Sequence, residues 1–287
     1  MILRHLSILS LLLIVILSQC DSIEVADFTD YPTSIEPYLI ADLVTLNTRY
    51  QQENEGHICS TLNEFGFSGF SRVLFIDDVN PCLDRTQVRV ELTRADTLIP
   101  LAKKSLLMNS EYTLVTDTTA LILDEVIPLY GCTICEGPDI NSVPIEYKIS
   151  FKPQIFEGVK VNDSRITVFV DSIGVNRIWG NWFPEFVNPD FINIGYEEAQ
   201  DMLLGWDIDM EPFTGGDTVF TVQEEHVQTL PEFEFYPYNN EGVLELRKTW
   251  KVFIQFNDDT FEGWYANIDV IDGLFLAIEP VNAESEF

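Results

Sequence analysis

Basic residues are scarce in this sequence, which holds 16 Lys and Arg against 47 Asp and Glu and carries a formal net charge of −31. A field of that sign repels the phosphates of nucleic acids and the anionic headgroups of membranes. The composition therefore excludes nucleic acid as a partner. Hydrophobic residues nevertheless make up 46% of the chain and aromatic residues 12%, which predicts a folded protein rather than a disordered one.

Histidine is scarce as well, and this excludes the zinc-peptidase signature, which needs two His one helical turn apart and a Glu as base. After residue 19 the chain holds only His57 and His226, and neither has a second His nearby. A serine-hydrolase elbow is also missing, because Gly69 follows Ser68 one position too early. The sequence predicts no catalytic residues, no cofactor and no metal site. Carboxylate pairs abound, so an acid-based extracytoplasmic hydrolase stays open as an alternative.

Long apolar runs are lacking except for one, from Leu6 to Leu17, which follows Arg4. A membrane-spanning helix needs about 20 apolar residues, and this run of about 12 is typical of a secretory signal peptide instead. It ends in Gln19 and Cys20, which resembles the lipobox of bacterial lipoproteins, although Gln19 stands where the motif usually has a smaller residue. The resemblance implies that residues 1–19 are removed and that Cys20 carries a lipid anchor. The protein would then lie in the cell envelope, on the periplasmic or surface side; without lipidation it would be secreted.

Four further cysteines, an even number in an exported chain, favour disulfide bonds. Cys59 and Cys82 would close one loop, and Cys132 and Cys135 would form a local staple. A zinc site shared by these cysteines is one alternative, and a redox Cys-x-x-Cys pair is another. The acidic Glu136 disfavours the thiolate that redox chemistry needs.

The first part of the mature chain divides into a polar tether over residues 20–36 and an N-terminal extension over 37–85. Apolar residues at helical spacing predict a helix between Pro37 and Tyr50 that packs on the following domain. These apolar residues are Leu39, Ile40, Leu43, Val44 and Leu46.

The rest of the chain predicts helices and strands in an order that occurs twice. Helical spacing predicts helices over residues 96–109, with Asp96 as the N-cap and Pro100 in the first turn, and over 195–204. Short alternating runs predict strands at 72–76, 87–92, 112–115, 145–151, 165–171, 249–256, 264–270 and 274–278. Turns are expected near Glu157 and Gly158, at 257–259, and at Asp272 and Gly273. The predicted fold class is α+β, with two small modules, each a helix packed on an antiparallel sheet, after a helical, disulfide-bearing extension.

Particular residues within this pattern resemble the fungalysin/thermolysin propeptide motif followed by a PepSY domain. The first module would cover residues 86–182, where residues 158–161 and 166–175 are similar to the family's small-residue turn, strand and hairpin. The second would cover 190–280, where residues 268–273 stand in place of Val-Asp-Ala-x-Thr-Gly, with Asp272 replacing the Thr. The family's modules fold against a protease and act as inhibitor or folding template. The resemblance therefore implies non-catalytic modules, although no protease follows in this chain.

Aromatic residues gather in the Pro-containing linker over residues 179–191. Trp179, Trp182 and Phe183 are predicted to form an exposed recognition patch, because rigid exposed aromatics are common binding anchors. The alternative is that they form the core between the modules. The predicted function is a non-catalytic envelope lipoprotein that binds or modulates an exported protein or peptide, such as a peptidase. A purely structural lipoprotein is a further alternative.

Overall fold

The computed structural model describes residues 31–69, 95–134, 141–184, 187–211, 219–228, 230–256 and 261–282. Cys20, Cys82, Cys135 and the predicted strands at 72–76 and 87–92 lie outside these residues, as do the signal peptide, most of the tether and the turn at 257–259. Residues Pro32–Phe287 form one compact unit. The fold is mixed α+β with mainly sheets and few helices, as the sequence predicts for its class.

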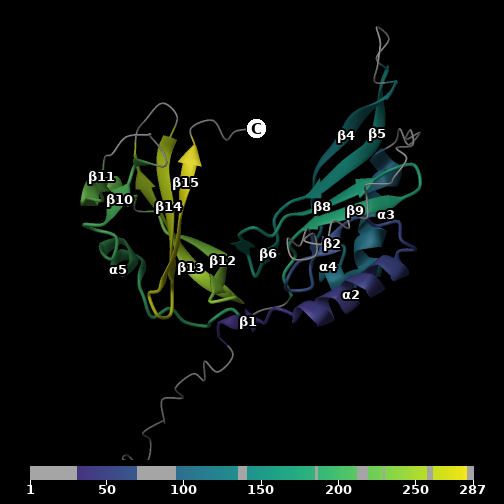
Figure 1. Ribbon diagram of the computed structural model, residues 1–287. Helices are drawn as coiled ribbons and strands as arrows, with labels where there is room; N and C mark the ends of the chain where they lie inside the picture. Colours follow the sequence, from purple (N-terminus) through teal and green to yellow (C-terminus); the bar gives the residue numbers. More distant parts are fainter. Residues whose placement is uncertain are drawn as a thin grey trace, which may run out of the picture. The chain divides into compact units, whose positions relative to one another are not determined.

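The first sheet is antiparallel, with strand order β4-β5-β8-β9. Its strands are β4 (Leu123–Ile134), β5 (Asn141–Phe151), β8 (Ile166–Val170) and β9 (Val175–Gly180). The helices α2 (Ile40–Glu53), α3 (Ala95–Met108) and α4 (Ser110–Thr113) lie together on one side of this sheet (Figure 1). Because Ile166, Val168 and Val170 alternate along β8, they share the face that packs against the helices. The predicted antiparallel pairing of 145–151 with 165–171 is confirmed.

Helix α3 confirms the helix predicted over 96–109. Leu98, Ala102 and Leu106 recur every four residues and are buried in the core of the first sheet. Pro100 lies inside the helix and not in its first turn, because the helix begins at Ala95.

The strand predicted at 112–115 is wrong, because this segment belongs to α4 and its end. The Tyr112 hydroxyl donates to Glu53 (2.8 Å) and the Thr113 hydroxyl donates to the Leu106 carbonyl (2.9 Å), so contacts with α2 and α3 hold the turn. Leu114 then ends it with a left-handed backbone at φ 58°. Tertiary contacts outweigh the weak strand propensity of these residues.

A short hairpin, β2 (Thr61–Leu62) and β3 (Ser68–Gly69), lies beside β9. The Ser68 hydroxyl donates to the Ile178 carbonyl (3.0 Å), and the Ile178 N–H donates to the Ser60 hydroxyl (3.1 Å). The N-terminal extension is therefore built onto the first sheet through side-chain hydroxyls.

The second sheet has strand order β15-β14-β13-β12-β7-β6, and β1 also pairs with β13. Its strands are β1 (Thr33–Ile35), β6 (Ile155–Phe156), β7 (Val159–Val161), β12 (Glu232–Asn240), β13 (Val243–Gln255), β14 (Phe261–Asp269) and β15 (Phe275–Asn282). The predicted C-terminal strand meander is confirmed by β13, β14 and β15. Strand β12 is not predicted by the sequence pattern. Its pairing with β7 is parallel, so this sheet is not wholly antiparallel.

The turn expected at Glu157 and Gly158 exists, but it joins β6 to β7 rather than β5 to β8. Both residues have positive φ values, 48° and 84°, as a tight hairpin turn requires. The hairpin lies between β5 and β8 in the sequence, yet both of its strands belong to the second sheet.

Helix α5 (Tyr196–Asp201) confirms the second predicted helix, in a shorter form. Ala199 and, just beyond it, Leu203 pack on the apolar face of the second sheet, against residues that include Trp250 and Trp264. The small hairpin β10 (Asp207–Asp209) and β11 (Val219–Thr221) and the 3-10 helix η1 (Glu224–His226) follow α5. None of the helices in the described part of the chain is long and apolar enough to cross a membrane.

Candidate functional site

Trp182 and Phe183 are buried, so the expectation that they form an exposed patch is wrong. Trp182 belongs to the core of the first sheet, and the Phe183 ring lies edge-on to Phe67, with centroids 6.3 Å apart. The Gln154 amide fixes this part of the linker, because it accepts from the Phe183 N–H and donates to the Phe183 carbonyl, both at 3.1 Å. The linker here is core and not a mobile connector.

Trp179 does not lie with Trp182. It belongs to β9, where it is half-buried and alternates with the core residue Ile178, so its ring projects from the face opposite the helices. The Arg177 guanidinium lies over both Phe169 and Trp179, 4.3 Å and 5.2 Å from the ring centroids. Arg177 also pairs with Glu146 on β5. This stack of cation and rings ties β5, β8 and β9 together, which gives Trp179 a structural role.

Cys59 and Cys132 are each disulfide-bonded, so neither offers a thiol for catalysis. Their expected partners, Cys82 and Cys135, lie outside the described residues, and the pairing of the four stays a prediction. His57, near Cys59 in sequence, has its Nε2 atom 3.3 Å from an Asp171 carboxylate oxygen. Because Cys59 is disulfide-bonded, its sulfur cannot serve this His–Asp pair as a thiolate nucleophile.

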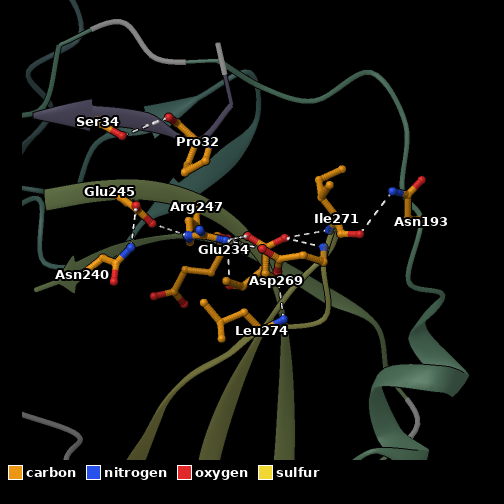
Figure 2. A network of polar contacts seen from close by, with 12 residues as sticks. Pro32, Ser34, Asn193, Glu234, Asn240, Glu245, Arg247, Asp269, Ile271 and Leu274 are labelled. Carbon is orange, nitrogen blue, oxygen red and sulfur yellow. Dashed lines mark hydrogen bonds and ion pairs between the residues drawn. The ribbon is translucent and has the colours of Figure 1, made fainter. Parts of the chain in front are cut away.

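The motif at residues 268–273 is a structural hairpin, built around the buried Asp269. One oxygen of the Asp269 carboxylate accepts the backbone N–H groups of Ile271 (2.7 Å) and Asp272 (3.2 Å). The other oxygen accepts from Arg247 at 3.0 Å. Figure 2 shows Arg247 between Asp269 and Glu245. The Arg247 Nε atom donates to the Glu245 carboxylate at 2.6 Å. The carboxylate of this motif thus closes the turn between β14 and β15.

Arg247 cannot act as an acid or base in this network. Burial alone would lower the pKa of Arg247, but hydrogen bonds to Glu245 and Asp272 and the charge of Asp269 raise it above its usual value. The guanidinium is therefore permanently charged and serves as a fixed partner for the carboxylates.

A cavity of about 280 Å³ lies beside the start of α2, and we call it the α2 pocket. It is bounded by β1, α2, the β2–β3 turn and α4, and its walls are partly apolar and partly polar. Its lining residues are Ile35, Glu36, Tyr38, Leu46, Phe65, Gly66, Phe67, Glu111, Leu114 and Pro184. The pocket therefore includes one residue of the linker, next to the buried Phe183.

The β2–β3 turn owes its shape to Asn63 and Gly66. The Asn63 side-chain oxygen accepts the N–H groups of Phe65 (3.1 Å) and Phe67 (2.9 Å). Gly66 has a φ of +78°, and a Cβ atom there would lie 2.8 Å from the Tyr38 ring. Only glycine fits this backbone and lets the ring of Tyr38 lie over the turn.

Four large apolar side chains at the start of α2 are exposed, and we call them the apolar strip; of the four, Tyr38 lines the pocket. They are Tyr38 (48% exposed), Leu39 (75%), Ile40 (65%) and Val44 (47%). Leu43, Leu46 and Tyr50, spaced i, i+3 and i+7, take the face of α2 that packs on the core. The expectation that all five apolar residues of this helix pack on the domain is therefore wrong for Leu39, Ile40 and Val44.

The surroundings of the pocket are acidic. Glu36, Asp42 and Glu64 are exposed and form no ion pair with any residue that the structure describes; we call them the acidic rim. The Glu64 carbonyl accepts the Tyr38 N–H at 2.9 Å, which places the rim beside the strip. Arg49 is already engaged, because it pairs with Glu111 and its Nε donates to the Tyr112 hydroxyl at 3.0 Å.

The lining of the α2 pocket contains no histidine, cysteine or serine. Within the described ranges, no group of three or more His, Cys, Asp or Glu residues is placed to hold a metal ion. The α2 pocket and the acidic rim are suited to bind a partner segment that carries an apolar side chain and, next to it, a positively charged one. One sequence signal pointed to it: Leu39 occupies the N-cap position of α2 without a capping side chain, so apolar residues begin where a polar cap is usual.

No family model matches the chain, and no curated protein matches it. Among solved structures, the Bacillus megaterium YpeB C-terminal domain is a distant neighbour, with 11% sequence identity and a TM-score of 0.30, covering 69% of each chain. A likeness at this level carries no argument about the function of the present chain.

Proposed function

We propose that this chain is a non-catalytic lipoprotein of the cell envelope that binds or modulates another exported protein through the α2 pocket and the apolar strip. The observation that carries the proposal is the exposure of Tyr38, Leu39, Ile40 and Val44 at the start of α2, where Tyr38 also lines a cavity. Scattered exposed apolar residues are ordinary, but several exposed apolar residues close together in one short segment, one of which lines a pocket, are typical of an interaction surface. A peptidase remains one candidate for the partner.

The two-module, PepSY-like organisation belongs to the same proposal. Its support is the carboxylate-closed hairpin at residues 268–273, because the Gly158 turn joins two strands of the second sheet and does not belong to the first module. This feature acts on the backbone, so it favours a scaffold role for the modules rather than a chemical one.

The binding surface is tested by site-specific crosslinking in the envelope, with a photoreactive amino acid at Val44 of the full-length protein. We expect a defined crosslinked partner that disappears when Leu39→Asp or Ile40→Asp is added, because a charge in an apolar interface is costly to desolvate. Thr48→Asp is the matched control, since Thr48 is an exposed residue of the same helix. A crosslink that survives both strip substitutions, or no specific crosslink, would contradict the proposal.

The anchor is tested separately through Cys20. We expect the wild-type protein to sediment with membranes after lipid labelling, and Cys20→Ala to be released, because the acidic surface alone does not bind anionic lipid. Equal membrane binding of the two forms, with a mature N-terminus elsewhere, would remove the lipoprotein assignment. Mass spectrometry without reductant tests whether Cys82 and Cys135 are oxidised together with Cys59 and Cys132; free thiols or bound zinc would contradict the disulfides.

A further inference from the structure

We infer that the segment bound at this surface is basic as well as apolar: one large apolar side chain enters the α2 pocket, and flanking Lys or Arg residues meet the acidic rim. This inference rests on the proposed function and names the chemistry of the partner. It follows from the size of the pocket and from the charge around it.

The size of the pocket favours a single side chain over a small-molecule ligand. Small-molecule sites usually enclose about 300–1,000 Å³ and carry several convergent polar groups. The α2 pocket has about 280 Å³, and Leu46, Phe65, Phe67 and Leu114 are among its lining residues. A buried apolar anchor surrounded by polar contacts is the common arrangement at protein interfaces.

The negative charge around the pocket favours a partner segment of positive charge. Glu36, Asp42 and Glu64 have no cation opposite them among the described residues, whereas Arg49 is held by Glu111 and Tyr112. A cationic segment neutralises the rim, while an acidic one is repelled.

The same charge argues against two other occupants. A second copy of this chain would bring an identical acidic rim and a further net charge of −31. An anionic membrane surface would be repelled in the same way. The surface therefore fits a basic, apolar segment of a different protein.

The test uses the full-length protein in detergent and short acetylated, fluorescent peptides with a central Phe and two lysines on each side. Fluorescence anisotropy measures their affinity. We expect the lysine peptide to bind, and the versions with Ser in place of Phe or Glu in place of Lys to bind far more weakly. Affinity should fall as salt is raised, because the rim is exposed to solvent.

Protein variants then separate charge from apolar contact. Exposed ion pairs contribute about 0.2–1 kcal/mol each, so the combined variant Glu36→Gln, Asp42→Asn and Glu64→Gln should weaken binding of the lysine peptide by about 3- to 160-fold. Glu224→Gln, at an exposed acid of η1, is the control and should change nothing.

The outcomes distinguish this inference from the proposed function. If the rim variant binds the lysine peptide normally and salt has no effect, while Leu39→Asp still removes the crosslinked partner, the surface binds a protein and the basic character is wrong. If neither the rim nor the strip matters for any binding, both ideas fall. Equal binding of the lysine and glutamate peptides would also overturn the inference.

Discussion

Replacing Arg247 with Met should destabilise the protein strongly, because it removes the cation from a buried network. The Arg247 side chain is 8% exposed and lies between Glu245, Asp269 and Asp272, at 2.6, 3.0 and 2.9 Å. Met keeps much of the volume of the Arg stem, so the change tests charge more than packing. It leaves the wholly buried Asp269 carboxylate without its cation.

The size of the effect follows from how buried each partner is. Removing one member of a buried ion pair costs about 3–5 kcal/mol, because the remaining charge is stranded. Asp272 is 50% exposed and contributes little, since surface pairs are worth about 0–1 kcal/mol. Asp269 still accepts hydrogen bonds from two backbone N–H groups, and these reduce the energetic cost of removing the Arg247 charge. We therefore expect Arg247→Met to lower the free energy of unfolding by about 3–4 kcal/mol.

Urea denaturation followed by tryptophan fluorescence measures this loss at neutral pH, with Asp272→Asn as the control. Asp272→Asn should cost less than about 1 kcal/mol. If Arg247→Met is as stable as the wild type at neutral pH, the network does not hold the hairpin and our account of the motif is wrong.

Three other substitutions test the core, the acid response and the pocket. Trp182→Ala should lower the free energy of unfolding by about 3–5 kcal/mol, because it empties a buried site; a loss under about 1 kcal/mol in urea denaturation would show that the indole is exposed. Burial raises the pKa of Asp171, but the hydrogen bond from Asn176 and two backbone N–H groups outweigh it and lower the pKa. Ionised Asp171 therefore stabilises the fold at pH values above its unfolded pKa of about 3.9, and this stabilisation is lost as the pH falls through the lower pKa of the folded protein. The loss of unfolding free energy caused by Asp171→Asn should accordingly vanish in strong acid. A loss that does not depend on pH would contradict this role of the Asp171 charge. Gly66→Ala should cost about 1 kcal/mol or more, because φ is positive, and should shift the NMR signals of the Tyr38 ring; unchanged signals would show that the ring does not cover the turn.

Elements with a strong local pattern were predictable from the sequence, and elements set by distant contacts were not. The helix at 96–109 and the strands at 145–151 and 165–171 carry clear periodicity and are present. Strand β12 was missed because Pro237 interrupts its alternating aromatics, and its place is set by pairing along β13. The segment at 112–115 became helical because Glu53, which is far away in sequence, and Leu106, at the end of the preceding helix, bind its side chains.

The candidate site was less predictable than the fold. The sequence shows apolar residues at Leu39, Ile40 and Val44 but cannot show which side of the helix the core covers. It also concentrated attention on Trp182 and Phe183, whose burial depends on Gln154 pairing with the linker backbone. The acidic rim could not be recognised among the 47 acidic residues of the chain, because only the structure shows that Glu36 lines the pocket and that Glu64 lies beside Tyr38.

The parallel pairing of β7 with β12 has a consequence for how the chain folds as it emerges amino-terminus first. Residues 159–161 precede β8 and β9, yet their neighbour in the sheet is at residues 234–235. A chain that emerges amino-terminus first can close its first sheet early, but the β6–β7 hairpin must wait for β12 to arrive. Until then, unpaired strand groups stay exposed, and such groups are prone to pair with other chains. The slowest and most vulnerable step of folding is therefore expected to be the docking of this hairpin, which locks the two sheets into one cooperative unit.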